Sequence, residues 1–161
     1  MVGSLALLEP AVIAFTPSAG AFQEAIAPIM AKYQSGDREG AVGAFCEYVL
    51  GPEYRKVLEK FMAPGAFEQA VADSDTPFTV ELEALMQWSL SAEDAGRIRQ
   101  PVLSVVGEES GQLFQDVHSL VLQWIPHAEK LRVPEANHGL QYVNPGGIAN
   151  GMADFLGRHA L

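Results

Sequence analysis

The residue best placed to do chemistry in this sequence is His138, in the stretch 133–159, VPEANHGLQYVNPGGIANGMADFLGRH. It lies in a short loop between a strand-like run and a strongly amphipathic helix. An imidazole presented from such a loop reaches into a crevice while the backbone behind it is fixed, and it accepts and releases protons near neutral pH. The sequence therefore predicts a proton-transfer residue at His138, with a partly buried structural histidine as the alternative.

Carboxylates follow two other strand-like runs. Glu9 comes directly after the apolar run 4–8, SLALL, and Glu109 follows the β-branched run 101–107, PVLSVVG. Ligand sites in an open α/β sheet form at the carboxyl ends of its strands. We therefore expect these carboxylates to converge with His138 if the runs are neighbouring parallel strands. The alternative is that each carboxylate is a solvated loop charge.

The elements that would position these residues alternate between strands and helices. The run 4–8 is typical of a strand buried in a parallel sheet, the run 101–107 is β-branched, and 130–133 is a further short strand. A helical stripe lies between the second and third runs, and a final helix begins with Asn144 as its N-cap and Pro145 in its first turn. Strands joined by helices of this length imply right-handed crossovers and a parallel sheet. The predicted class is α/β, with about three parallel strands.

The middle of the chain has a different character. Residues 21–97 read as four or five short helices in succession, and the clearest apolar stripe runs through residues 54–62. Such a series predicts a helical lid or bundle, because it contains no strand-like run that could join a sheet. We therefore expect residues 1–20 and 98–161 to form an α/β core and residues 21–97 to form a separate helical part.

Composition excludes several classes of partner. Ten basic residues against twenty acidic ones give a formal charge of -10, so nucleic acid is not expected as a partner. No apolar run approaches the roughly 20 residues that a membrane-spanning helix needs. The single cysteine, Cys46, cannot form an internal disulfide, which favours a reducing cytoplasm. His118, His127 and His159 lack metal-ligand spacing and are expected at the surface, so we predict no metal and no cofactor.

Two stretches of the sequence resemble the C-terminal half of an α/β-hydrolase. PVLSVVGEES (101–110), a helix, and AEKLRVPEANHGLQYVNPGGIANGMADFLGRH (128–159) are similar to the seventh strand, the eighth strand, the catalytic-histidine loop and the last helix of that fold. SLALLEP (4–10) resembles its sixth strand, and the block 21–97 stands where the family inserts its cap domain. The resemblance covers essentially the whole chain. It implies a partial α/β-hydrolase fold, a short parallel sheet with flanking helices and an inserted all-helical cap.

The resemblance also implies roles for individual residues. His138 matches the general base, which takes a proton from a serine or activates water. Strand seven commonly ends G-x-x-D in this family, but residues 107–110 read GEES, and serine cannot replace the acid. Members resembling haloalkane dehalogenases instead place the acid directly after strand six, where Glu9 stands. Glu9 is thus the first candidate for the carboxylate that orients the histidine, Glu109 the second and Asp116 the third. The alternative for Glu9 is a polar stop at the end of a buried strand.

The nucleophile of the family is missing from this sequence. No G-x-S-x-G occurs, so neither the serine nor the oxyanion amide after it is present. The leading hypothesis is a hydrolase of a small apolar ester or related substrate that is inactive alone. The strand Ser4–Leu8 would then expose an apolar edge, and we expect a homo-oligomer or pairing with a missing N-terminal half through it. The alternative is a non-catalytic small-molecule-binding or assembly module.

Overall fold

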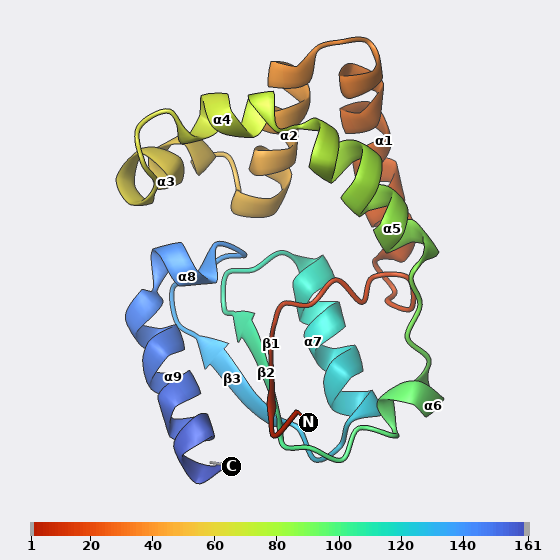
Figure 1. The fold of residues 1–161 in the computed structure, drawn as a ribbon, viewed down its shortest axis with the longest axis vertical. Coiled ribbons are helices and arrows are strands. Elements are labelled where there is room, and N and C mark those ends of the chain that lie inside the picture. The colour runs from red at the N-terminus through yellow and green to blue at the C-terminus, as the bar shows by residue number, and fades with distance from the viewer. Residues whose placement is uncertain (1, 160–161) are drawn as a thin grey trace. The chain divides into compact units, whose positions relative to one another are not determined.

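The computed structural model describes residues 2–159 and divides the chain into two compact units (Figure 1). The first, which we call the α/β unit, runs up to Ser18 and resumes at Ser89; the second, the helical unit, is Ala19–Trp88. The helical unit thus ends before the short helix α6 (Ala92–Ala95), which the sequence placed in the helical part. Within residues 2–159 no helix combines the length and the apolar character that crossing a bilayer requires.

The α/β unit is built on a three-stranded parallel sheet. Its strands are β1 (Leu5–Leu8), β2 (Val102–Gly107) and β3 (Glu129–Val133), in the order β1-β2-β3. In the register of the sheet Leu8 pairs with Val105, and Gly107 pairs with Val133. The predicted α/β class with about three parallel strands is therefore confirmed. The carboxyl ends of all three strands meet at one edge of the sheet, which is the condition under which Glu9, Glu109 and His138 were expected to converge.

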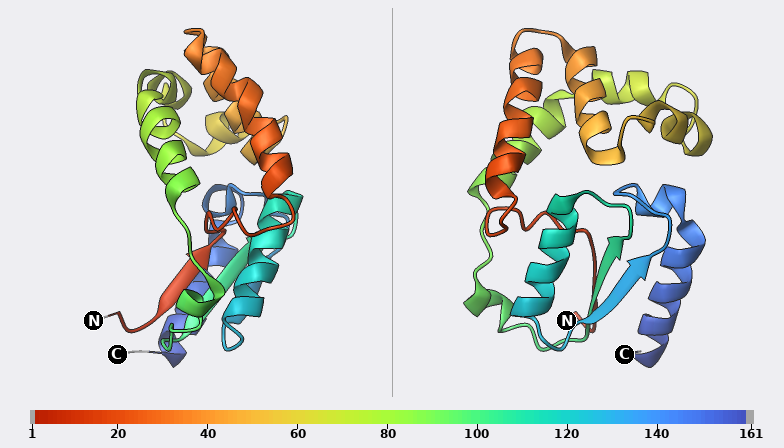
Figure 2. Two further views of the ribbon diagram at one scale, coloured as in Figure 1. Left: turned by 90° about the vertical axis from the view of Figure 1, so that its right-hand side faces the viewer. Right: turned by 180° about the vertical axis from the view of Figure 1, so that it is seen from behind.

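Helices cover both faces of this sheet (Figures 1 and 2). Helix α7 (Gln112–Trp124) packs on one face and α9 (Pro145–Arg158) on the other. Alternate residues of β2 divide between the two cores, with Val102 on the α7 side and Leu103 on the α9 side. Because side chains alternate across a strand and both faces are covered, every residue of β2 is buried.

The last helix begins and packs largely as predicted. The Asn144 side chain accepts a hydrogen bond from the Gly147 amide at 2.9 Å, which caps α9, and Pro145 lies in the first turn. On its inner face Phe155 is 1% exposed. Leu156, the next residue, is 45% exposed, so the buried stripe of α9 is narrow. The short helix α8 (Leu140–Val143) joins this helix to the His138 loop.

The helical unit contains the remaining helices. They are α1 (Ala19–Gln34), α2 (Arg38–Leu50), α3 (Tyr54–Phe61), α4 (Ala66–Ala72), the π-helix η1 (Thr76–Glu81) and α5 (Leu82–Gln87). The helix η1 begins at Thr76, after a turn at residues 73 and 74. Asp75 accepts hydrogen bonds from Tyr33 Oη and Arg38 Nη2, and Arg38 also donates to the buried Ser74 hydroxyl at 3.0 Å. These long-range contacts fix the start of η1, and the local sequence does not show them.

His118 is buried, so its predicted place at the surface was wrong. It lies on α7 beneath β2, is 6% exposed, and has its Nδ1 2.8 Å from the hydroxyl of Ser104, which is fully buried. The surroundings lower the pKa of His118, first through burial and then through the positive charges of Arg132 and Lys130, which outweigh the opposing carboxylate of Glu9. His127 is exposed, as expected, and His159 is half-buried against Glu129.

The lowered pKa of His118 predicts how stability depends on pH. The unfolded chain takes up the proton first, near the ordinary histidine value of about 6.5, so the contribution of His118 to stability is complete above that pH. It is lost progressively as the pH falls through and below that value. The free energy of unfolding, measured by urea denaturation, should fall between about pH 7 and about pH 5 in the wild type. We expect this fall to be smaller in His118→Gln. If His127→Gln, at an exposed position, reduced this fall by the same amount as His118→Gln, burial would not be the cause.

Candidate acid–base site

Glu9 and His138 meet at the carboxyl edge of the sheet although they are 129 positions apart in the sequence. Glu9 follows β1 and His138 lies in the loop after β3. The Oε2 atom of Glu9 is 2.6 Å from Nδ1 of His138. The Glu9 side chain is 1% exposed, whereas that of His138 is 32% exposed. The pair therefore consists of a buried carboxylate and an imidazole that solvent can reach.

The backbone of Glu9 adopts an uncommon conformation. Its φ is 43°, in the left-handed region that a side chain with a Cβ rarely occupies. Its amide still donates to the Val105 carbonyl at 3.1 Å, so the residue continues the hydrogen-bond ladder of β1 while its side chain turns toward the loop of His138. Conformations of this kind cost on the order of 1 kcal/mol and cluster at functional sites. This observation argues against Glu9 as a simple polar stop.

The second oxygen of the Glu9 carboxylate is held by the loop after β2. Oε1 accepts hydrogen bonds from the Gly107 amide at 2.8 Å and from the Ser110 hydroxyl at 2.5 Å. With the contact to His138, both oxygens of this buried carboxylate have polar partners. A buried charge is tolerated in a protein when it is satisfied in this way.

The loop after β2 is itself anchored. Gln115 Nε2 donates to the carbonyls of Gly107 and Ser110 at 2.8 and 3.2 Å, and Gln115 Oε1 accepts from Arg132 at 3.1 Å. The amide of Glu109 also donates to the Ala136 carbonyl at 2.9 Å, which joins the loop to the segment before His138. The two loops of the site therefore form one hydrogen-bonded structure.

Phe114 fixes the plane of the histidine ring. This residue, in the first turn of α7, stacks on His138 with ring centroids 3.9 Å apart and an interplanar angle of 11°. Sequence analysis did not identify it, nor did it identify the contacts of Ser110 and Gln115 with the site. The only sequence signal for all three was their place in or just after the loop that follows β2.

The arrangement leaves one ring nitrogen of His138 available. Nδ1 faces a carboxylate, so the hydrogen-bond network assigns the proton of the neutral ring to Nδ1. Nε2 makes no hydrogen bond to any residue that the structure describes. A neutral imidazole with this tautomer presents the lone pair of Nε2 to a proton donor, as a general base requires.

The structure does not bring the other two candidate acids to His138. Glu109 is exposed, and its side chain makes no hydrogen bond or ion pair with a described residue. Asp116 lies within α7 and accepts hydrogen bonds from Ser18 and, at 2.7 Å, from Gln112. Over residues 2–159 no three His, Cys, Asp or Glu side chains are grouped as a metal site requires.

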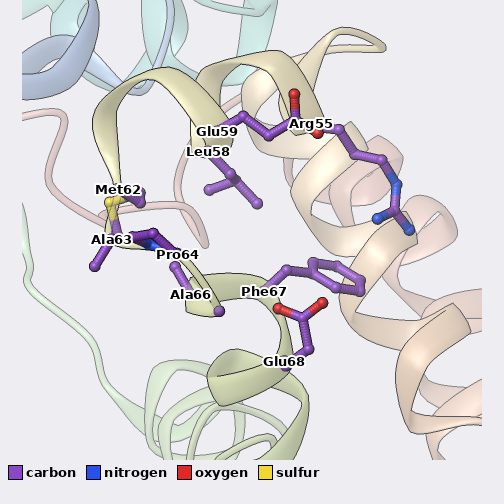
Figure 3. Close-up of a pocket in the computed structure, with 10 residues that line it drawn as sticks. Arg55, Leu58, Glu59, Met62, Ala63, Pro64, Ala66, Phe67 and Glu68 are labelled. Atoms are coloured by element: carbon purple, nitrogen blue, oxygen red, sulfur yellow. The ribbon is translucent and has the colours of Figure 1, made fainter.

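The helical unit has hollows of ligand size, of which two have apolar side chains in their lining. One, of about 380 Å³, lies where α3 runs into α4, and the Arg55 guanidinium at its margin is 4.5 Å above the Phe67 ring (Figure 3). The other, of about 530 Å³, is lined mainly by apolar side chains of α1, η1 and α5. Neither holds a histidine or a carboxylate–histidine pair.

Comparison with known proteins gives matches at the level of structure. No protein-family model matches the sequence, and no curated protein matches it significantly. An α/β-hydrolase from Sphaerobacter thermophilus matches 96% of this chain and 58% of its own, with a TM-score of 0.61 and 20% identity. NosK from Streptomyces actuosus matches 98% of this chain and 59% of its own, with a TM-score of 0.49 and 18% identity. E-2-(acetamidomethylene)succinate hydrolase matches 97% of this chain and 58% of its own, with a TM-score of 0.48 and 19% identity.

The match to the Sphaerobacter protein extends over 96% of this chain. The chain spans 58% of the length of that hydrolase. At 20% identity the likeness concerns the fold and not the chemistry. This chain therefore has part of the α/β-hydrolase fold: three parallel strands with helices on both faces, matched over 58% of a hydrolase of that fold.

Proposed function

We propose that this chain supplies the acid–base half of a hydrolase active site, with His138 as general base and Glu9 as the carboxylate that orients it. The observation that carries the proposal is the 2.6 Å contact between Nδ1 of His138 and Oε2 of the buried Glu9. A buried carboxylate at this position holds the ring in one tautomer and stabilises the imidazolium that forms when Nε2 takes up a proton. The remaining features of the site serve this pair.

The chemistry proposed is hydrolysis of a small, largely apolar ester or a related substrate. Nε2 of His138 removes the proton of a serine hydroxyl or a water while that oxygen attacks the substrate carbonyl. The imidazolium then gives the same proton to the leaving alkoxide, so His138 returns to its starting state and Glu9 remains ionised throughout. Where serine is the nucleophile, water then attacks the acyl-serine in the same way. Nε2 takes up a proton from this water and returns it to the serine oxygen as the acid leaves. The attacking serine has to come from outside the sequence considered, since no G-x-S-x-G occurs in it.

The free edge of β1 is where we propose that the missing part pairs. Within the part of the chain that the structure describes, β1 pairs with β2 on one side only, and its residues, Leu5–Leu8, carry no charge. The other outer strand, β3, carries Glu129, Lys130 and Arg132, which are the kind of residues that protect an edge from pairing. A strand from the polypeptide that bears the nucleophile fits the β1 edge, and a second copy of this chain is the competing occupant. We assign the assembly to the cytoplasm, as the sequence predicts.

A chimera tests this function. The part of the Sphaerobacter hydrolase with no counterpart here would be fused ahead of residues 1–161. We expect the folded chimera to react with a fluorophosphonate and to hydrolyse p-nitrophenyl acetate, whereas the isolated chain does neither above the uncatalysed rate. A folded but unreactive chimera would contradict the proposal. Ester hydrolysis by the isolated chain that His138→Ala leaves unchanged would contradict it as well.

The second candidate function is non-catalytic binding of an apolar small molecule. It is favoured by the hollow of about 530 Å³ in the helical unit, whose volume lies within the range of ordinary ligand sites. Its lining includes Phe22, Met30 and Leu82. A solvatochromic dye that binds the isolated chain, and loses its affinity in Leu82→Glu but not in the exposed variant Val80→Glu, would support this candidate.

A further inference from the structure

The donors around Glu9 form a site for a carboxylate in their own right. We propose that the Gly107 amide, the Ser110 hydroxyl and Nδ1 of His138 make up a carboxylate cradle that is assembled without the help of Glu9, and that this cradle binds a free carboxylate as small as formate once the Glu9 side chain is removed. The inference deepens the proposed function. It rests on that function in one respect, the role of Glu9 as the carboxylate that orients His138.

The first support is the convergence of three donors on one carboxylate. The Gly107 amide and the Ser110 hydroxyl lie 2.8 and 2.5 Å from Oε1, and Nδ1 of His138 lies 2.6 Å from Oε2. The carboxylate they surround is 1% exposed at the side chain. Two donors on one oxygen and one on the other specify the orientation of a planar anion, and not only its position.

The second support is that the donors are held by contacts that do not involve Glu9. Gln115 binds the carbonyls of Gly107 and Ser110, and Arg132 holds Gln115 in turn. The backbone hydrogen bond from Glu108 to Val133, at 3.0 Å, closes the base of the loop. The donors therefore remain aimed at the same point when the Glu9 side chain is absent.

The third donor is held independently too. The ring of His138 stacks on Phe114 with its centroid 3.9 Å away, which restricts rotation of the imidazole. The loop before His138 accepts a hydrogen bond from the Glu109 amide through Ala136. Consequently Nδ1 keeps its direction toward the centre of the cradle.

Ser110 has a defined role within the cradle. By donating to Oε1 it turns the carboxylate so that Oε2 faces Nδ1 of His138. It does not meet the reacting atoms, so it is a positioning residue and not a catalytic one. The loop after β2 thus binds the acid of a neighbouring strand and does not supply an acid of its own.

Glu9→Gly tests the cradle directly. Glycine suits the backbone at this position because φ is 43°, so the substitution removes the carboxylate without adding strain. We expect the wild type to show a low-field NMR signal for the Nδ1 proton of His138. This signal should be absent in Glu9→Gly and return when sodium formate is added. The unfolding temperature of this variant should rise with formate concentration, as for any ligand that binds only the folded state.

Matched variants separate the cradle from nonspecific salt effects. The cradle is filled by a carboxylate in the wild type and by an amide in Glu9→Gln, so neither protein should respond to formate. In Glu9→Gly, sodium chloride should not have the effect that formate has. Glu9→Gly/Ser110→Ala should bind formate about tenfold more weakly, because a donor to a charged group is lost. An unchanged formate affinity in that double variant would overturn the role of Ser110, and no formate response in folded Glu9→Gly would overturn the cradle.

A second measurement covers the case in which Glu9→Gly does not fold. In the otherwise wild-type chain, Ser110→Ala should increase solvent exchange of the His138 Nδ1 proton about tenfold, while Ser110→Thr keeps the wild-type rate. Equal rates for all three proteins would overturn the proposal. If formate binds but the chimera is unreactive, the cradle is supported and the proposed catalytic role is contradicted. If the chimera is reactive but formate does not bind, only the cradle is contradicted.

Discussion

Replacing His138 with Gln in the folded chimera is expected to lower kcat/KM for p-nitrophenyl acetate by roughly 10² to 10⁴, the range that a positioned general base contributes. Glutamine is similar in size and retains polar atoms at the loop, but no atom of its side chain takes up a proton at neutral pH. The loss should fall mainly on kcat, because the base acts in the transition state and not in substrate binding.

Replacing Glu9 with Gln should give a loss of similar order for a different reason. The amide of the new side chain has one oxygen, which can accept from either the Gly107 amide or Nδ1 of His138 but not from both sides as the carboxylate does. The ring then loses its fixed tautomer, and the imidazolium loses its countercharge. The exposed Glu109→Gln is the control and should stay within about twofold of the parent. Equal losses for Glu9→Gln and Glu109→Gln would contradict the assignment of Glu9.

Most of the fold of the α/β unit is predictable because its signals are local. A β-branched run such as 101–107 and a capped stripe such as the one that follows Asn144 depend on residues next to one another in the sequence. The pairing of Glu9 with His138 is accessible to the same reasoning. Both residues follow strands, and parallel strands bring their carboxyl ends to one edge. Choosing Glu9 over Glu109 required the resemblance, since position alone favours neither.

The features that sequence analysis missed all depend on contacts between distant segments. His118 reads as a polar residue on a helix, but the hydroxyl of Ser104 and the packing of α7 on β2 make it part of the core. The π-helix η1 begins where Asp75 meets Tyr33, which lies 42 positions earlier. Phe114 reads as one more apolar helix residue until the His138 ring is placed against it. Side-chain patterns record which face of an element is buried, but not what lies against that face.

Gly107 is the residue at which the fold and the site depend on each other most directly, and Gly107→Ala is expected to lower the unfolding free energy by about 3 kcal/mol. A Cβ at this position would lie 2.1 Å from the Ala136 carbonyl oxygen and 2.6 Å from the Ser110 hydroxyl. The Ala136 carbonyl is backbone in the loop that carries His138, so the clash cannot be relieved by turning a flexible side chain. Equilibrium urea denaturation measures the loss.

The same substitution should also separate Glu9 from His138, because the displaced atoms belong to the two loops that hold this pair. In Gly107→Ala we therefore expect the Nδ1 proton signal of His138 to be lost even at low temperature, where the protein is still folded. Gly157→Ala is the matched control: Gly157 lies in α9 with open space around it, and alanine there should be neutral or stabilising by up to about 1 kcal/mol. If Gly107→Ala matched Gly157→Ala in both measurements, the close approach of the two loops would not be what holds the acid against the base.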